Sequence, residues 1–304
     1  MTTSTRHEPE IDATLRGIFD AAGAEGYLHC REITASADAA GVGLAPDRPV
    51  VTASVFKLPV LLEYCRQVSA GQLAATDRVR VPAGGRTVGP SGLSVLRDEV
   101  ELSLRDLAAQ MISVSDNCAT DVLLERVGIE AVNAGLRDLG LQQTTLVGDC
   151  RRLLGDLADD LGGREAAEQL GAGTDPASLA GVRSLDPAKT NRTTARETTT
   201  LLARIWQDTA GPAEACAETR RILGLQLFRD RLRSGFGEDV RVSSKTGTLP
   251  GIRNEAGVVE LPDGHSYAVA VFTRARSLAW VQPAIDASIG AAAAAAVGHL
   301  RAQR

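Results

Sequence analysis

The chain has 304 residues, of which 44% are hydrophobic and 23% charged, and its formal net charge is −5. This length and composition are ordinary for a globular protein and suffice for a large core in one domain or two closely packed ones. The acidic balance argues against nucleic acid or an anionic membrane as a partner, and an aromatic content of 3% leaves few rings to stack on bases. We therefore expect no nucleic-acid and no membrane partner.

Cysteine and histidine are sparse and scattered, which predicts neither a disulfide framework nor a metal site. The five cysteines lack Cys-x-x-Cys spacing, and the four histidines lie far apart in the chain. The polar first ten residues lack the apolar core of a signal peptide, and no uncharged stretch is long enough to span a membrane. We expect a cytoplasmic protein with reduced thiols that uses no metal or other cofactor.

Hydrophobic periodicity predicts strands near both ends of the chain and helices between them. Ahead of the central region, we expect a helix at 11–22, a strand at 27–33 and partner-strand segments at 42–44 and 50–51. The expected central helices cover 56–68, 102–112, 118–127, 129–140, 163–170, 193–206, 213–223 and 225–232. The expected closing elements are strands at 240–244, 256–261 and 267–273 and a helix at 281–301. A Pro-Asp-Gly turn joins the last two strands as a hairpin.

This order predicts an α+β fold, in which a five-stranded antiparallel sheet built from both chain ends is flanked by helices. An all-helical domain is inserted between the two halves of the sheet. We expect a flexible tail at 1–10, a discontinuous sheet domain at 11–53 and 205–304, and the helical domain at 54–204. The active site is expected at the junction of the two domains.

Ser54 and Lys57 form the motif with the clearest chemical meaning. Residues i and i+3 of a helix lie on one face about a turn apart, so the Lys57 amine can take the proton of the Ser54 hydroxyl. Serine is a weak nucleophile without such a neighbour. The spacing alone also fits a helix N-cap serine followed by a solvated lysine.

Lysine usage favours the catalytic interpretation. Lysine occurs only at positions 57, 189 and 245, whereas arginine supplies nearly all the other positive charge. The pKa of an amine can be lowered until it acts as a base, which a guanidinium cannot do. Two of the three lysines lie in recognisable short motifs, which favours a specific use of the amine.

Two further motifs follow the first in the chain, Ser115-Asp116-Asn117 and Lys245-Thr246-Gly247. The three motifs in this order resemble the class A serine β-lactamases and the penicillin-binding proteins. The segment 191–199 resembles the chain that leaves the omega loop of that family, and 249–264 resembles the hairpin after its third motif. The resemblance covers roughly residues 10–300 and implies a β-lactamase/transpeptidase-like fold.

The resemblance implies a catalytic role for the main residues of the motifs. Ser54 would be the acylated nucleophile, Lys57 its base, and Ser115 the relay that carries a proton to the leaving nitrogen. Lys245 would help to keep Lys57 neutral through like-charge repulsion. The backbone N–H groups of Ser54 and Thr248 would form the oxyanion hole.

The resemblance also implies substrate-binding residues and a carboxylate on the substrate. The implied substrate-binding set is Asn117, Thr246, Gly247, Thr248 and Arg253. Arg253 follows Lys245 by eight residues, close to the spacing of a carboxylate-binding arginine, but it also fits an ordinary surface charge. Similarly, Ser115-Asp116-Asn117 also fits a helix-breaking turn, in which Asp116 has a structural role.

The sequence departs from the class A pattern at the residue that activates the deacylating water. Those enzymes carry a glutamate in a Glu-x-x-Leu-Asn element, but counting back without gaps from Arg196-Glu197 places Ser184 at its position. Asp186 is the nearest candidate for a substitute base, and the segment 148–183 is longer than that of the family. The polar N-terminus is a second departure, because resistance enzymes of the family work outside the cytoplasm.

These observations predict a serine hydrolase that forms an acyl-Ser54 intermediate with a small lactam, amide or ester. Hydrolysis of β-lactams, with slow deacylation, is the leading hypothesis. Three alternatives stay open: an intracellular acyltransferase or esterase of natural-product metabolism, a β-lactam-binding protein that is acylated once without turnover, and a glutaminase-like relative.

Overall fold

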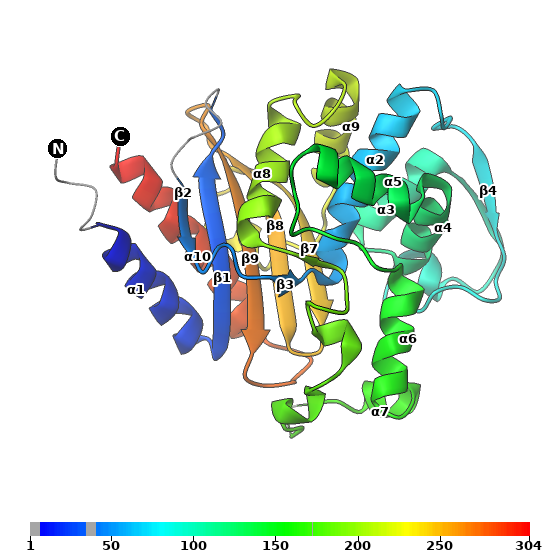
Figure 1. The fold of residues 1–304 in the computed structure, drawn as a ribbon, viewed down its shortest axis with the longest axis horizontal. Coiled ribbons are helices and arrows are strands. Elements are labelled where there is room, and N and C mark those ends of the chain that lie inside the picture. Colours follow the sequence, from blue (N-terminus) through cyan, green and yellow to red (C-terminus); the bar gives the residue numbers. More distant parts are fainter. Residues whose placement is uncertain (1–6, 35–40, 172) are drawn as a thin grey trace.

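The computed structural model describes residues 7–34, 41–171 and 173–304. Its centre is a five-stranded antiparallel sheet with the strand order β2-β1-β9-β8-β7 (Figure 1). The five strands are β1 (Ala24–Glu32), β2 (Gly41–Leu44), β7 (Arg241–Leu249), β8 (Ile252–Glu260) and β9 (Ser266–Ala275). Both chain ends contribute strands, as the sequence predicts, and the α+β fold class is confirmed.

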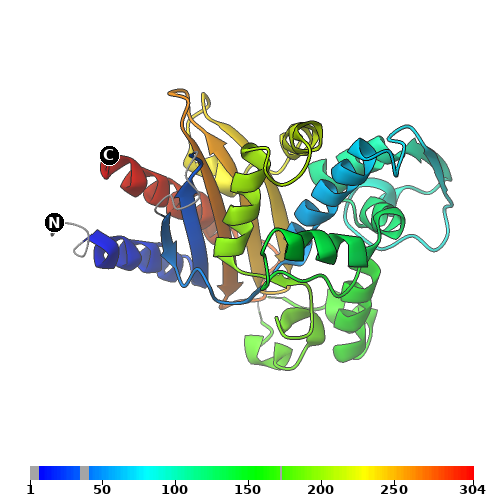
Figure 2. The same cartoon turned by 45° about the horizontal axis from the view of Figure 1, so that its top comes forward.

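Helices cover both faces of this sheet because successive side chains of its central strands alternate between two apolar layers. In β9, Val269 and Val271 belong to the hydrophobic cluster formed with α1 (His7–Ala21) and α10 (Pro283–Ala302). Phe272, on the opposite face, belongs to the larger cluster that continues into the helical part of the molecule. Figure 2 shows α1 and α10 together on one side of the sheet and α8 on the other.

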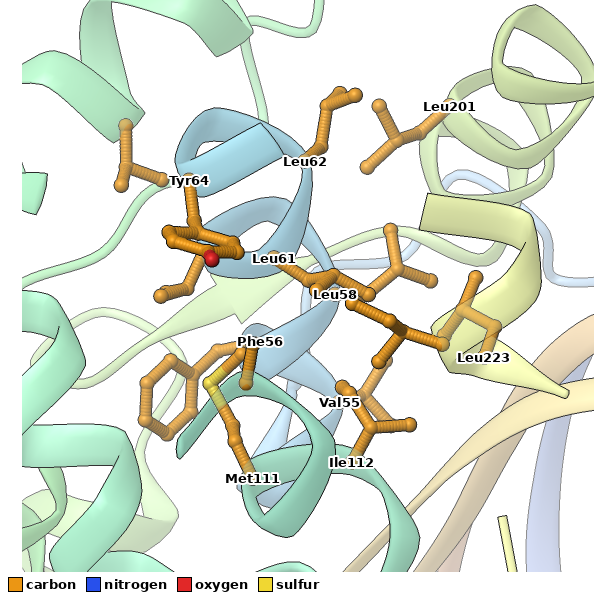
Figure 3. Packing of buried hydrophobic residues seen from close by; sticks show 14 of the residues in the cluster. Val55, Phe56, Leu58, Leu61, Leu62, Tyr64, Met111, Ile112, Leu201 and Leu223 are labelled. Atoms are coloured by element: carbon orange, nitrogen blue, oxygen red, sulfur yellow. The ribbon is translucent and has the colours of Figure 1, made fainter. Parts of the chain in front are cut away.

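The helical part packs around α2 (Lys57–Ser69), which follows a short 3₁₀ helix at Ala53–Phe56. Buried side chains of these two helices meet Met111 and Ile112 of one neighbouring helix and Leu223 of another (Figure 3). The remaining central helices are α3 (Leu104–Ser113), α4 (Asn117–Val127), α5 (Ile129–Asp138), α6 (Cys150–Asp160), α7 (Arg164–Glu168), α8 (Ala195–Trp206) and α9 (Ala213–Leu223). Short strands form two separate pairs, β3 (Val50–Val51) with β6 (Arg192–Thr193) and β4 (Arg78–Val81) with β5 (Val100–Ser103).

Three local expectations are wrong. The strand partner expected at 50–51 pairs with β6 and not with β1. No helix forms at 225–232, because the Leu227 N–H donates to the Ser113 carbonyl (3.1 Å) and not to a carbonyl one turn back. The structure also contains α6, where no helix is expected; Asp149 caps it by accepting a hydrogen bond from the Arg152 N–H.

The expected domain boundaries need two adjustments. The first helix begins at His7, so the expected tail at 1–10 is too long, and residues 1–6 lie outside the described part of the chain. Helix α8 packs against β9 and β1, although most of it falls in the expected helical domain at 54–204. Within the described residues, no helix is both long and apolar enough to cross a membrane.

Candidate active site

Ser54 lies in the 3₁₀ helix that leads into α2, at the point where this helix meets β7. Ala53, the residue before it, has φ +45°, a left-handed conformation that is strained for a residue with a Cβ. A Cβ on Gly247 would lie 2.7 Å from the Thr52 carbonyl oxygen and 3.2 Å from the Ser54 nitrogen. Only glycine therefore fits at position 247, and the close approach places the Ser54 backbone N–H beside β7.

Lys57 is fully buried, and its amine lies among oxygen atoms of the second motif. Lys57 Nζ donates to the Ser115 carbonyl at 2.6 Å, to Asn117 Oδ1 at 2.9 Å and to Ser115 Oγ at 3.2 Å. Burial lowers the pKa of Lys57 below its ordinary value, with Cys150, Asp116 and Asp121 acting in the opposite direction. In the described part of the chain, the amine hydrogen-bonds to Ser115 and Asn117 and not to Ser54.

Ser115 connects the amines of the first and third motifs. It has φ +59°, again a left-handed conformation, and its Oγ accepts a hydrogen bond from Lys245 Nζ at 3.0 Å. Burial and the charge of Lys57 lower the pKa of Lys245 well below its ordinary value, with Glu255 opposing. Two buried amines that contact one hydroxyl repel each other when both are protonated, so the arrangement favours loss of one proton.

Asp116 is fully buried and supports the backbone of the second motif. Its Oδ1 accepts from the Ala119 N–H (3.1 Å), which caps α4, and its Oδ2 accepts from the Leu93 N–H (2.6 Å). These contacts agree with the structural role expected for Asp116. Asn117 Nδ2 donates to the Val88 carbonyl at 2.9 Å, so the neighbouring loop is joined to the same motif.

The Asp116→Ala variant is expected to be less stable than the wild type by about 3 kcal/mol. It loses a helix cap and leaves the buried Leu93 N–H without an acceptor. Urea unfolding measures this difference, with Asp138→Ala, an exposed position at the end of α5, as the matched control. A loss no greater than that of the control would show that Asp116 does not hold the motif together.

The part of β7 that carries Gly247 and Thr248 is supported by an arginine that sequence reasoning missed. Arg231 Nη1 donates to the carbonyls of Gly247 and Asn254, both at 3.0 Å, and its Nη2 donates to Thr248 Oγ1 at 2.8 Å. Its Nε pairs with Asp286 Oδ1 at 2.7 Å in a nearly buried ion pair. No short motif marks Arg231, which lies well before Lys245 in the chain.

Arg253 and Asp186 make other contacts than those expected of them. Arg253 is nearly buried and donates from Nη2 to the Trp280 carbonyl, on the loop before α10. Asp186 accepts from the Ala188 N–H at 2.9 Å and pairs with Lys189 at 3.5 Å, within its own partly exposed turn. Among the described residues, neither side chain makes a hydrogen bond or ion pair with Ser54, Lys57 or Ser115.

Cys150, at the start of α6, is a buried side chain that the sequence did not single out. Burial raises the pKa of its thiol to about 12, and the charge of Lys57 acts in the opposite direction. Ser184, predicted at the position of the family glutamate, is buried in a 3₁₀ helix packed against α6. The helices α6 and α7 occupy much of the segment 148–183 that precedes it.

Comparisons with known proteins agree with this geometry. A model of the β-lactamase enzyme family matches residues 10–300. The β-lactamase regulatory protein BlaB of Streptomyces cacaoi is 34% identical over 263 residues, covering 81% of this chain and 84% of that protein. The extended-spectrum β-lactamase PER-1 of Pseudomonas aeruginosa is 27% identical over 234 residues, covering 73% and 66%. The structure of a β-lactamase from Sphaerobacter thermophilus superposes with a TM-score of 0.75 at 25% identity, covering 96% and 97%.

The fold and these matches define the class as that of the class A β-lactamases and penicillin-binding proteins, so the resemblance of the three motifs is confirmed. Within this class, the chain belongs to the β-lactamase enzyme family, whose model spans nearly its whole length.

Proposed function

We propose that this protein is a serine hydrolase that opens a β-lactam, or a related lactam, amide or ester, through an acyl-Ser54 intermediate. One observation carries the proposal. The buried amines of Lys57 and Lys245 both lie within 3.2 Å of Ser115 Oγ, and Lys57 begins the helix that directly follows the Ser54 segment. The contacts support a deprotonable amine, Lys57, joined to a proton relay, Ser115, in the turn of chain that follows the candidate nucleophile.

In the proposed acylation, the Ser54 proton is carried to the leaving nitrogen of the substrate. Neutral Lys57 accepts the Ser54 proton while Oγ bonds to the substrate carbonyl carbon, and the oxyanion is held by the N–H groups of Ser54 and Thr248. As the carbon–nitrogen bond breaks, the proton passes from Lys57 through the Ser115 hydroxyl to the leaving nitrogen. Lys245, which donates to Ser115 Oγ, stabilises this hydroxyl as it gives up its own proton.

A carboxylate on the substrate fits beside Thr246 and Thr248 of β7. Thr246 and Thr248 supply hydroxyl donors there, and Arg231 fixes the Thr248 hydroxyl by donating to its oxygen. Since the Thr248 oxygen accepts from Arg231, its own hydrogen is free to point at a carboxylate oxygen. Arg231 orients the Thr248 hydroxyl in this proposal, and its positive charge adds long-range attraction for the carboxylate.

In this proposal, hydrolysis of the acyl-enzyme is the slow step. The Asp121 carboxylate already accepts from the N–H groups of Cys150 (2.8 Å) and Arg151 (3.0 Å) and from Thr87 Oγ1 (2.6 Å). The Cys150 thiol, with a pKa raised to about 12, is neutral at pH 7 and is no base there. General-base assistance contributes about 10²–10⁴-fold to such a step. Without a carboxylate base, we therefore expect deacylation to be slower by about that factor.

A β-lactam-binding protein without turnover is the second candidate function. It is favoured because neither Asp121 nor Cys150 is a ready base for deacylation. It is also favoured by the name of the Streptomyces cacaoi relative, a β-lactamase regulatory protein. Both candidates share the acyl-Ser54 step and differ only in the fate of the ester.

Incubation with a chromogenic cephalosporin, followed by intact-mass analysis, tests the proposal. Continued colour development supports a hydrolase, and a stable adduct of one lactam per protein without turnover supports the binding protein. A protein that shows neither colour nor adduct would contradict the lactam substrate. Release of ammonia from glutamine would then support the glutaminase-like alternative.

A further inference from the structure

A cavity of about 130 Å³ lies on the sheet face that also carries α8, apart from the candidate active site. It is bounded by residues of β1, β8 and β9, by β3 with the chain before it, and by the end of the 3₁₀ helix Arg183–Leu185 with the chain after it. Figure 1 shows β3 crossing in front of the sheet. Ser54, Lys57, Ser115 and Lys245 are not among its described lining residues. An occupant of the cavity would therefore leave these four side chains uncovered.

The floor of the cavity is apolar and partly aromatic. Tyr27 on β1 lies opposite Phe272 on β9. Arg274, two residues after Phe272, lies opposite Ile252 on β8. Directly opposite residues on neighbouring strands share one face of a sheet, as do residues two apart on one strand, so all these side chains point to the same side. Leu185 lines the cavity from a different segment and is buried.

The buried polar side chains of the wall already have partners within the protein. Asn254 Nδ2 donates to the Val51 carbonyl at 2.9 Å, and Asn254 Oδ1 accepts from the Thr273 N–H at 3.1 Å. Thr273 Oγ1 donates to the Arg253 carbonyl at 2.5 Å. The interior of the cavity therefore offers an occupant mainly apolar contacts, and charged contacts come from its exposed mouth.

Arg48 brings a guanidinium without an ion partner to this mouth. The Arg48 side chain is exposed, and its Cζ lies 5.7 Å from the centroid of the Tyr27 ring. In the part of the chain that the structure describes, this guanidinium makes no hydrogen bond or ion pair. Asp47, the residue before it, is paired with Arg196 at 2.7 Å. A charged group with several N–H donors is therefore available to an occupant.

The other charges beside the cavity are matched by opposite charges. Arg274 lines the cavity and lies directly opposite Glu25 on the neighbouring strand, where opposite charges stabilise each other. Asp186, next to the lining residue Leu185, pairs with Lys189 at 3.5 Å. One positive charge, that of the arginine before β3, is left over, and it matches an occupant with one negative charge.

We propose that this cavity binds a small aromatic monocarboxylate, of which benzoate is the simplest example. An apolar cavity of about 150 Å³ is large enough for benzene. A volume of about 130 Å³ therefore suits one six-membered ring with its substituent at the mouth. The ring packs among Tyr27, Phe272 and Leu185. The carboxylate accepts two hydrogen bonds from Arg48, because a planar guanidinium and a planar carboxylate match in geometry.

The occupant is a bound ligand and not a second substrate. Burial raises the pKa of Tyr27 to about 12, and the Glu25 carboxylate acts in the same direction. The Tyr27 hydroxyl is thus neutral at pH 7, and the Thr273 hydroxyl donates to a carbonyl. Among the described lining residues, no activated nucleophile faces the occupant. The inference therefore goes beyond the proposed function and does not depend on the acyl-Ser54 step.

Isothermal titration of the full chain with benzoate tests the site. We expect a Kd of about 1 mM or tighter, a moderate affinity for so few heavy atoms. Benzyl alcohol has the ring without the charge, and acetate has the charge without the ring. Each is expected to bind at least about tenfold more weakly than benzoate.

Arg48→Gln should weaken benzoate binding about tenfold or more, because it replaces the charged donor by a neutral amide. The position is exposed, so the unfolding midpoint without ligand should stay unchanged. Arg126→Gln, at an exposed arginine on α4, is the matched control. It removes the same charge away from the cavity and should bind benzoate like the wild type.

Three results would overturn the inference. The first is absence of benzoate binding at about ten times the expected Kd. The second is equal affinity in Arg48→Gln and Arg126→Gln, and if Thr248→Ala then weakens binding, benzoate occupies the substrate-carboxylate position on β7 and not this cavity. The third is equal affinity for benzoate and acetate, which would leave only a surface ion pair at Arg48.

Discussion

Lys57→Arg is expected to slow acylation of Ser54 by about 10²–10⁴-fold, the usual contribution of a general base. Arginine keeps the positive charge but cannot be deprotonated, so the Ser54 proton loses its acceptor. Lys57 is fully buried and hydrogen-bonds to Ser115 and Asn117, so the variant's unfolding midpoint is measured alongside. Stopped-flow fluorescence with a fluorescent penicillin gives the acylation rate constant.

Lys245→Arg is the matched comparison for this prediction. Lys245 donates to Ser115 Oγ and is as deeply buried as Lys57. Its proposed role needs only a positive charge and a hydrogen bond. We expect a loss at least about tenfold smaller than that of Lys57→Arg. Equal tolerance of arginine at both positions would show that Lys57 is not the base.

The pH dependence of acylation follows from the same residue. Because burial lowers the pKa of Lys57, the neutral amine forms at a lower pH than in an ordinary lysine. Wild-type acylation should therefore keep its full rate down to a lower pH than an ordinary lysine base would allow, and fall as the pH drops through that lowered pKa, where protonation removes the base. An acylation rate that needs strongly alkaline pH would contradict the lowered pKa.

Turnover is expected to begin with a burst of one product per protein molecule and then to continue slowly. The two carboxylates whose charge acts on Lys57, Asp116 and Asp121, already accept hydrogen bonds from backbone N–H groups. Without a base for the deacylating water, the second step is expected to be about 10²–10⁴-fold slower than acylation. Stopped-flow absorbance with a chromogenic cephalosporin measures the burst and the slow phase.

A carboxylate placed beside Lys57 should speed that slow phase. Cys150→Glu supplies one at the start of α6, and we expect deacylation to accelerate about tenfold or more. Cys150→Gln has the same shape without a base and should leave the slow phase unchanged, which separates base catalysis from a change in packing. Equal rates in the two variants, or fast wild-type turnover without a burst, would contradict the missing-base explanation.

The sequence predicted the architecture well because the sheet and the three motifs depend on local patterns. Short apolar runs mark the end of β8 and most of β9, and the Pro-Asp-Gly turn joins them as a hairpin. The order of the three motifs predicted one site for Ser54, Lys57, Ser115 and Lys245, and hydrogen bonds join the last three of these side chains. These residues come together in space because of the fold that the chain shares with its family. The spacing within any one motif does not predict this.

The sequence could not predict contacts that depend on long-range packing. Arg253 has nearly the right spacing from Lys245, yet Arg231 reaches Thr248 because the turn before β7 folds back on this strand. Asp186 was chosen by counting, and the burial of Cys150 in α6, far earlier in the chain, was not expected. One local signal was available: Cys150, Leu153 and Leu157 form the buried stripe of α6, behind a capping Asp149.

Identification of the acylated residue tests the central claim most directly. The protein is incubated with a penicillin, digested and mapped by tandem mass spectrometry, in parallel with Ser54→Ala and with Ser178→Ala, an exposed control. The account predicts one adduct on Ser54 in the wild type and in the control, and none in Ser54→Ala at an unchanged unfolding midpoint. An adduct that persists in Ser54→Ala, or that maps to another residue of the wild type, would contradict it.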